Sequence, residues 1–317
     1  MTPLIPASPQ DTRDLYGMIV SDLERRVACD RRAVHQVALE CVAHLASINS
    51  PEPTGARIVV LHGPDAQGLA ALTRAASESL DLPFARIPLT AVSEMGWAGT
   101  SLDEWIKRMW TTPAKRQWSA WSIIVLSGLE ALRVRRGTYK AGSAATRDYR
   151  EGKAQNVAAL LRGETVPCGP VASGWDAQRA MIILTTAYDR STYDTDVLEE
   201  WGILPELAEI LSTATWIHVP AASGIVAERA VAGHLDDVVA LYASCGYDLT
   251  ISPEAIRWAA AQAEERGESA ATAARWIRDA ARARLIAMLE VGVTDPRVAL
   301  GPDDVVAPPR ARAEWHD

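Results

Sequence analysis

The residues with the clearest chemical spacing are two glycines, Gly63 and Gly68, which follow a short apolar run. Their separation is that of the phosphate-binding loop G-x-x-x-x-G-K-S/T. In that loop, backbone N–H groups hold the phosphates, the lysine neutralises them and the hydroxyl binds Mg²⁺. Leu69 and Ala70 stand where the motif needs the lysine and the hydroxyl. The sequence therefore predicts the frame of a phosphate loop without the groups that perform its chemistry.

Two interpretations of this loop stay open. If it descends from a nucleotide site, the turn around Gly63, Pro64 and Gly68 can still attract an anion weakly through backbone N–H groups and a helix N-terminus. Asp65 adds a carboxylate that would repel phosphate. Alternatively, the stretch is an ordinary strand, turn and helix that never bound a nucleotide. In both cases we expect no tightly held cofactor, and weak ATP or ADP binding at most.

The elements that must position this loop are short apolar runs. Such runs are typical of strands that are buried on both faces of a parallel sheet. They lie at 58–61, 84–89, 122–126, 181–184 and 216–219. Helical patterns separate them, and Gly68 is expected to open the helix after the loop. Alternating strands and helices predict an α/β fold with a parallel sheet.

The chain is expected to contain several segments. Residues 1–55 read as two helices and a Pro/Gly linker, and residues 56–221 as the α/β domain. Residues 222–300 read as a small α-helical domain with Ala-rich helices at 227–243, 253–266 and 270–289. Residues 301–317 are rich in proline and charge, which predicts a disordered tail.

Composition narrows the possible functions. The formal net charge is −8, so no global basic field attracts nucleic acid. The four cysteines are scattered and form no C-x-x-C pair, which argues against a zinc site or a disulfide framework. The N-terminus lacks a signal pattern, and no apolar run approaches the roughly 18 residues of a membrane span. These features predict a cytoplasmic protein with reduced thiols and no membrane or metal partner.

Five further segments occur in an order that is informative. They are L-D-L-P-F at 80–84, E-M-G-W-A-G at 94–99, the region 146–152, W-G-I-L-P-E-L at 201–207 and A-R-W-I-R at 274–278. Together with the α/β-then-helical plan, they resemble the ClpX-type unfoldases of the AAA+ ATPase family. The resemblance implies a P-loop-type AAA+ sheet domain and a small helical lid.

The resemblance also implies two binding sites. The segment 94–99 is similar to the aromatic pore loop E-x-G-Y-V-G, which would grip a polypeptide through Gly96, Trp97, Ala98 and Gly99. The alternative for Trp97 is a buried or merely superficial ring on a turn. Arg275 stands at the sensor-2 position and would contact nucleotide phosphate. The alternative for Arg275 is a solvated helix arginine.

The departures from the family fall where its ATP chemistry should be. The Walker B strand should end in two acids, but Leu126 is followed by Ser127 and Gly128. Glu209 and Ile210 replace the arginine finger that follows the 201–207 segment. The zinc-binding N-terminal domain is absent, and so is the loop that docks the ClpP protease. With the phosphate-loop lysine also lost, we expect no catalytic residue and no metal ligand.

The resulting expectation is a catalytically inactive ClpX-like AAA+ protein that acts as a protein-binding, assembly or regulatory subunit of chaperone type. Its partner is expected to be another protein, either a further copy of this chain or a related AAA+ protein. The alternative is an ATP-binding or ATP-hydrolysing unfoldase with divergent motifs. A nucleic-acid-binding module is disfavoured by the acidic charge.

Overall fold

A computed structural model describes residues 5–6, 8–50, 55–92, 100–108, 120–134, 149–164, 175, 177–188, 192–221, 223–266, 268–292 and 295–307. The chain divides into two compact units. The first unit comprises Met1–Val27 and Arg31–Pro220, and the second comprises Ala28–Asp30 and Ala221–Asp317. The segment predicted at 1–55 is therefore mostly part of the first unit.

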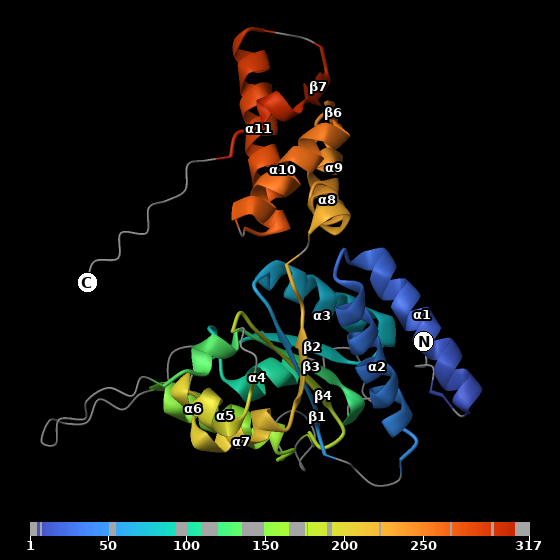
Figure 1. Ribbon diagram of the computed structural model, residues 1–317, viewed down its shortest axis with the longest axis vertical. Helices are drawn as coiled ribbons and strands as arrows, with labels where there is room; N and C mark the ends of the chain where they lie inside the picture. Colours follow the sequence, from blue (N-terminus) through green and yellow to red (C-terminus); the bar gives the residue numbers. More distant parts are fainter. Residues whose placement is uncertain are drawn as a thin grey trace, which may run out of the picture. The chain divides into compact units, whose positions relative to one another are not determined.

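The first unit is built on five parallel strands in the order β2-β3-β4-β1-β5 (Figure 1). They are β1 (Arg57–His62), β2 (Phe84–Pro88), β3 (Ile123–Ser127), β4 (Met181–Thr186) and β5 (Thr215–His218). The central strand β4 is buried along its whole length, as expected for a strand that is covered on both faces. Each strand coincides with one of the five apolar runs, so the predicted α/β class with a parallel sheet is confirmed.

Helices cover both faces of this sheet (Figure 1). On one face lie α1 (Pro9–Arg26), α2 (Arg31–Ser47) and α3 (Ala66–Leu80). On the other lie α4 (Leu102–Lys107), the short 3-10 helix η3 (Leu129–Leu132), α5 (Tyr149–Leu161), α6 (Thr195–Glu200) and α7 (Pro205–Ser212). The N-terminal helices pack on α3 and β5, which explains why they belong to the same unit as the sheet.

The strand order creates one place where the chain leaves neighbouring strands in opposite directions. After β1 the chain passes through α3 to the β2 edge, whereas after β4 it passes through α6 and α7 to β5, beyond β1. In open parallel sheets, ligand sites occur at such a point, outside the carboxyl ends of the strands. A functional site is therefore expected at the carboxyl ends of β1 and β4.

The second unit is mainly helical, but it also contains a small sheet. Its helices are α8 (Gly224–Gly233), α9 (Asp236–Ser244), α10 (Pro253–Arg266) and α11 (Ala270–Glu290). The strands β6 (Asp248–Ile251) and β7 (Arg297–Leu300) pair in parallel, and the 3-10 helix η4 (Pro302–Asp304) follows. Neither strand was predicted from the sequence.

Two further expectations for this unit need correction. The helix predicted at 227–243 is two helices, because α8 ends at Gly233, a poor helix former, and the chain turns before α9. The disordered tail predicted from residue 301 does not begin there, since Val305 is buried and Ala307 packs against the core of the unit. Residues 308–317 lie outside the described part of the chain.

Candidate functional site at the carboxyl ends of the strands

The turn between β1 and α3 is shorter than a phosphate loop requires. β1 ends at His62 and α3 begins at Ala66, so three residues connect them. Gly68 lies inside the first turn of α3 and does not open the helix as predicted. Leu69 N already donates a helical hydrogen bond to the carbonyl oxygen of Asp65, at 3.0 Å. The residues between the two glycines therefore do not form an open loop that could wrap around a phosphate.

The carboxylate of Asp65 lies against the first turn of α3. A Cβ atom on Gly68 would lie 2.9 Å from Asp65 Oδ2 and 3.2 Å from Asp65 Cγ. The N-terminus of a helix carries partial positive charge and unpaired N–H groups, and it favours a nearby anion. Here the chain supplies that anion itself, so an incoming phosphate would meet a like charge.

Gly63 has a packing role that needs no nucleotide. A Cβ atom at this position would lie 2.0 Å from the carbonyl oxygen of Val219. Gly63 N donates to Thr186 O at 3.1 Å, and Val219 N donates to His62 O at 2.8 Å. The ends of β1, β4 and β5 therefore converge on Gly63, and only glycine fits there.

The residues at the lysine and hydroxyl positions both lie within α3. Leu69 is 2% exposed and belongs to the core of the first unit. The carbonyl oxygen of Ala70 accepts a hydrogen bond from the Thr73 hydroxyl at 2.9 Å, inside α3. A lysine in place of Leu69 would have to bury its ammonium group, which is costly without a partner.

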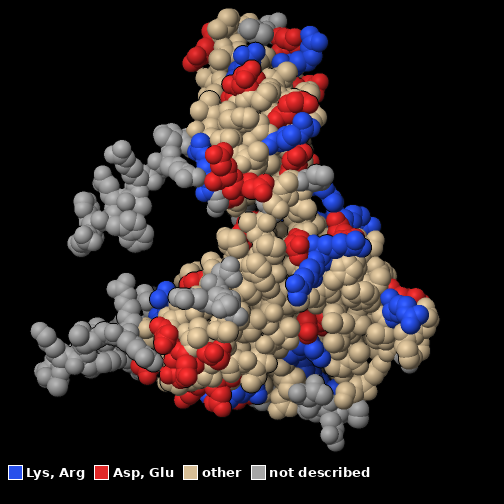
Figure 2. All heavy atoms as spheres, viewed as in Figure 1, with Lys and Arg blue, Asp and Glu red and all other residues tan. Residues whose placement is uncertain are grey.

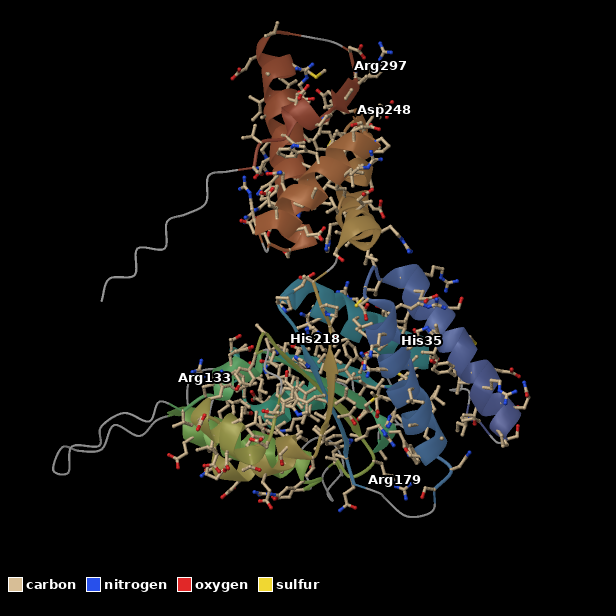
Figure 3. The ribbon with its side chains drawn as sticks, viewed as in Figure 1. His35, Arg133, Arg179, His218, Asp248 and Arg297 are labelled. Carbon is tan, nitrogen blue, oxygen red and sulfur yellow. The ribbon has the colours of Figure 1, made fainter. Side chains whose placement is uncertain are left out.

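A cluster of aromatic and histidine rings lines the same edge of the sheet and was not predicted. The rings of Tyr193 and Trp216 are stacked, with centroids 3.8 Å apart. The Tyr193 hydroxyl is 2.8 Å from Nδ1 of the buried His62, whose ring lies 5.0 Å from that of His218 at the end of β5 (Figure 3). These rings come from segments far apart in the sequence, so only the common direction of parallel strand ends could have indicated that they meet.

The segment 201–207 joins this cluster. Tyr188 stacks on Trp201 with centroids 3.9 Å apart. Arg133, at the end of η3, donates from Nε to the carbonyl oxygen of Trp201 at 2.7 Å (Figure 3). Gly202 has φ 99, in the left-handed region that favours glycine, and Pro205 begins α7. The segment therefore shapes the junction between α6 and α7 and holds it to the end of η3.

The end of β3 carries a single acid, and that acid is engaged. Ser127 and Gly128 occupy the positions where two acids would bind Mg²⁺ and activate water. Glu130 accepts a hydrogen bond from the Thr186 hydroxyl at 2.6 Å and another from the backbone N–H of Ala187. This carboxylate thus ties the end of β3 to the end of β4.

Three of the predicted cofactor-binding residues lie in this turn or in the first turn of α3. Gly63, Pro64 and Gly68 lie together there, but Arg275 lies on α11 in the second unit, where its side chain is exposed. The predicted pore loop, Gly96, Trp97, Ala98 and Gly99, and the region 146–148 lie outside the described residues.

The described residues show neither a metal site of three or more His, Cys, Asp or Glu ligands nor a membrane-spanning helix, and neither a family model nor a curated protein matches the chain. Among the residues that the structure describes, no group of three or more His, Cys, Asp or Glu side chains is arranged to hold a metal ion. No helix in the described part of the chain is both long and apolar enough to cross a membrane. No protein-family model matches the chain, and no curated protein matches it.

Proposed function

We propose that this chain is a ClpX-like AAA+ protein that does not hydrolyse ATP and serves as a protein-binding, assembly or regulatory subunit. A five-stranded parallel α/β unit followed by a smaller, mainly helical unit supports this assignment. The observation that carries the loss of ATPase activity is the Asp65 carboxylate lying against Gly68 at the start of α3.

Three further losses also argue against ATP hydrolysis: the lysine, the Mg²⁺-binding acid and the base. The lysine that would neutralise the phosphates is replaced by a buried leucine, Leu69. Ser127 and Gly128 supply neither the carboxylate that would hold Mg²⁺ nor the carboxylate that would activate the attacking water. Charge stabilisation and positioning provide nearly all of the catalysis of phosphoryl transfer, and each part contributes orders of magnitude to the rate. Their combined loss leaves no route to turnover at a useful rate.

We expect the purified protein to release no phosphate from ATP and to bind ATP or ADP more weakly than millimolar. Phosphate-release assays with Mg²⁺ and isothermal calorimetry measure the two quantities. Turnover near about 1 s⁻¹, at the low end of enzyme rates, would contradict the proposal. Micromolar affinity that Arg275→Ala abolishes would support the alternative, an ATP-binding switch.

A pair of variants isolates the role of Asp65 in this experiment. Asp65→Asn removes the negative charge but keeps an oxygen acceptor, so nucleotide affinity should rise above that of the unaltered protein. Asp194→Asn is the matched control, because it removes the same charge at the N-terminus of another helix, where Asp194 accepts from Val197 N at 3.0 Å at the start of α6. Equal affinities for both variants would show that Asp65 does not exclude the anion.

The protein-binding role is tested at Trp97. If its ring is a binding anchor, Trp97→Ala should weaken partner capture about thirtyfold, the effect of losing roughly 2 kcal/mol. The melting temperature should stay nearly unchanged, whereas a core tryptophan would cost roughly 3–5 kcal/mol of stability. Pull-down from the native host and thermal melting of the same variant separate the two roles. A variant that melts much lower and still captures its partner would assign Trp97 to the core.

A further inference from the structure

The two histidines at the ends of β1 and β5 have no part in the proposed function. His62 and His218 are the last residues of their strands, and they pair in register. Side chains in register on neighbouring parallel strands leave the sheet on the same face. The two imidazole rings accordingly lie with their centroids 5.0 Å apart, at the carboxyl edge of the sheet where ligand sites occur in open parallel sheets.

This separation is the one that a shared metal ion requires. Imidazole nitrogens bind Zn²⁺ at about 2.0–2.1 Å, and two imidazoles on one tetrahedral ion therefore have ring centroids about 5 Å apart. The backbones of His62 and His218 already satisfy this condition, because they are neighbours in the sheet. His218 is exposed, so its ring can turn to bring a nitrogen to the ion.

Tyr193 supplies the outer contact that a metal-bound histidine needs. Its hydroxyl is 2.8 Å from Nδ1 of His62 and 3.3 Å from Nε2, so the closer contact is to Nδ1. A histidine that binds a metal through one ring nitrogen usually donates the N–H of the other to an oxygen, which fixes the tautomer and the ring orientation. The Tyr193 oxygen can accept that hydrogen bond, and its ring is held in place by stacking on Trp216.

The surroundings of the pair suit an ion that prefers imidazole. His62 is buried, and the exposed His218 gives solvent a route to it. Most of the surface over β5 is uncharged in the view of Figure 2, so the ion would depend on the two rings rather than on surface carboxylates. Imidazole ligands favour Zn²⁺, Cu²⁺ and Ni²⁺, whereas Mg²⁺ and Ca²⁺ favour oxygen ligands.

We propose that His62 and His218 bind one divalent transition-metal ion, Zn²⁺ or Cu²⁺, with Tyr193 orienting His62 and water completing the coordination. The ion would link the ends of β1 and β5. A site of two imidazoles and water is smaller than the groups of three His, Cys, Asp or Glu side chains that the described residues lack. The proposal does not depend on the loss of ATP hydrolysis.

Metal titration of the untagged full-length protein, without nucleotide, tests this site. We expect one equivalent of Zn²⁺ to bind with micromolar affinity by calorimetry, and the melting temperature to rise with the concentration of free Zn²⁺. The electron paramagnetic resonance spectrum of the Cu²⁺ complex should show splitting from two nitrogens. Mg²⁺ should cause neither effect, because it prefers oxygen ligands.

Two variants separate the ligands from their outer contact. His218→Gln alters an exposed side chain, so the protein should stay folded by circular dichroism while Zn²⁺ affinity falls at least about a hundredfold. Tyr193→Phe should weaken binding about tenfold, at the low end for loss of an outer contact. Its Cu²⁺ spectrum should still show two nitrogens, since both imidazoles remain.

His35 on α2 provides the matched control. Its Nδ1 lies 2.6 Å from the Tyr16 hydroxyl, which makes a second tyrosine–histidine pair, but its Nε2 accepts from the cationic Arg31 at 3.3 Å. His35→Gln should therefore leave metal binding unchanged. The inference would be overturned by an unaltered protein that binds neither ion at millimolar concentration. Equal affinity of His218→Gln and the unaltered protein would also overturn it. None of these outcomes bears on phosphate release from ATP, so the two proposals fail separately.

Discussion

Replacing Gly63 with alanine is expected to lower the free energy of unfolding by about 3 kcal/mol, the upper end of the usual cost of overpacking. The added Cβ would lie 2.0 Å from the carbonyl oxygen of Val219. That oxygen is part of a backbone held by the hydrogen bond from Val219 N to His62 O, so no flexible side chain can move aside. Urea unfolding at neutral pH measures the loss.

Gly17 provides the matched control for this substitution. It lies in α1, where a Cβ atom would meet nothing within 4 Å. Gly17→Ala should therefore stabilise the protein by roughly 0.5–1 kcal/mol, through the better helix propensity of alanine. If Gly63→Ala were as harmless as Gly17→Ala, the convergence of β1, β4 and β5 on Gly63 would be wrong.

A second large effect is expected from pH. His44 on α2 is 1% exposed, and burial lowers its pKa from 6.5 to about 4. Its hydrogen bond to the carbonyl oxygen of Trp121 acts in the opposite direction, and the charge of Arg57 lowers the pKa further. Between pH 6.5 and 4 the His44 side chain binds a proton in the unfolded chain but stays neutral in the folded chain. The contribution of His44 to the free energy of unfolding is therefore fully present above pH 6.5. It is lost as the pH falls toward 4, by about 3 kcal/mol in total.

The measurement compares unfolding free energies at about pH 7 and about pH 5, where the loss should already be about 2 kcal/mol. His44→Gln keeps an N–H donor for the Trp121 carbonyl but does not titrate, so its stability should depend much less on pH. His35→Gln on the same helix is the control and should retain the pH dependence of the unaltered protein. A His44→Gln variant that loses as much stability as the unaltered protein would assign the effect to other groups.

Much of the first unit could be predicted from the sequence because its strands are continuous apolar runs. Val59 and Val60 lie in a strand covered on both faces, so the strand could be recognised without an alternation of apolar and polar residues. β6 and β7 were not predicted because each has only four residues and α10 and α11 separate them in the sequence. Asp248 pairs with Arg297, almost fifty residues later. A short strand with a distant partner leaves almost no local pattern.

The site itself was harder to predict than the sheet. The spacing of Gly63 and Gly68 located the turn correctly, but it suggested a phosphate loop. Glycine at position 63 is explained by the close approach of the Val219 backbone, and glycine at position 68 by that of the Asp65 carboxylate. Both contacts are visible only in three dimensions. The stacking of Tyr193 on Trp216 was missed for the same cause, since the two rings meet only when β5 lies beside β1.

The place of β1 between β4 and β5 has a consequence for biosynthesis. Val59 pairs with Ile183 on one side and with Thr215 on the other, so a ribosome makes both partners long after β1 itself. Until then the nascent chain carries an apolar segment with two unsatisfied edges, which is the kind of segment that aggregates. Slow long-range pairing lengthens this exposure. Translation rate and chaperone supply, rather than the final stability of the fold, should therefore govern the soluble yield of this protein in cells.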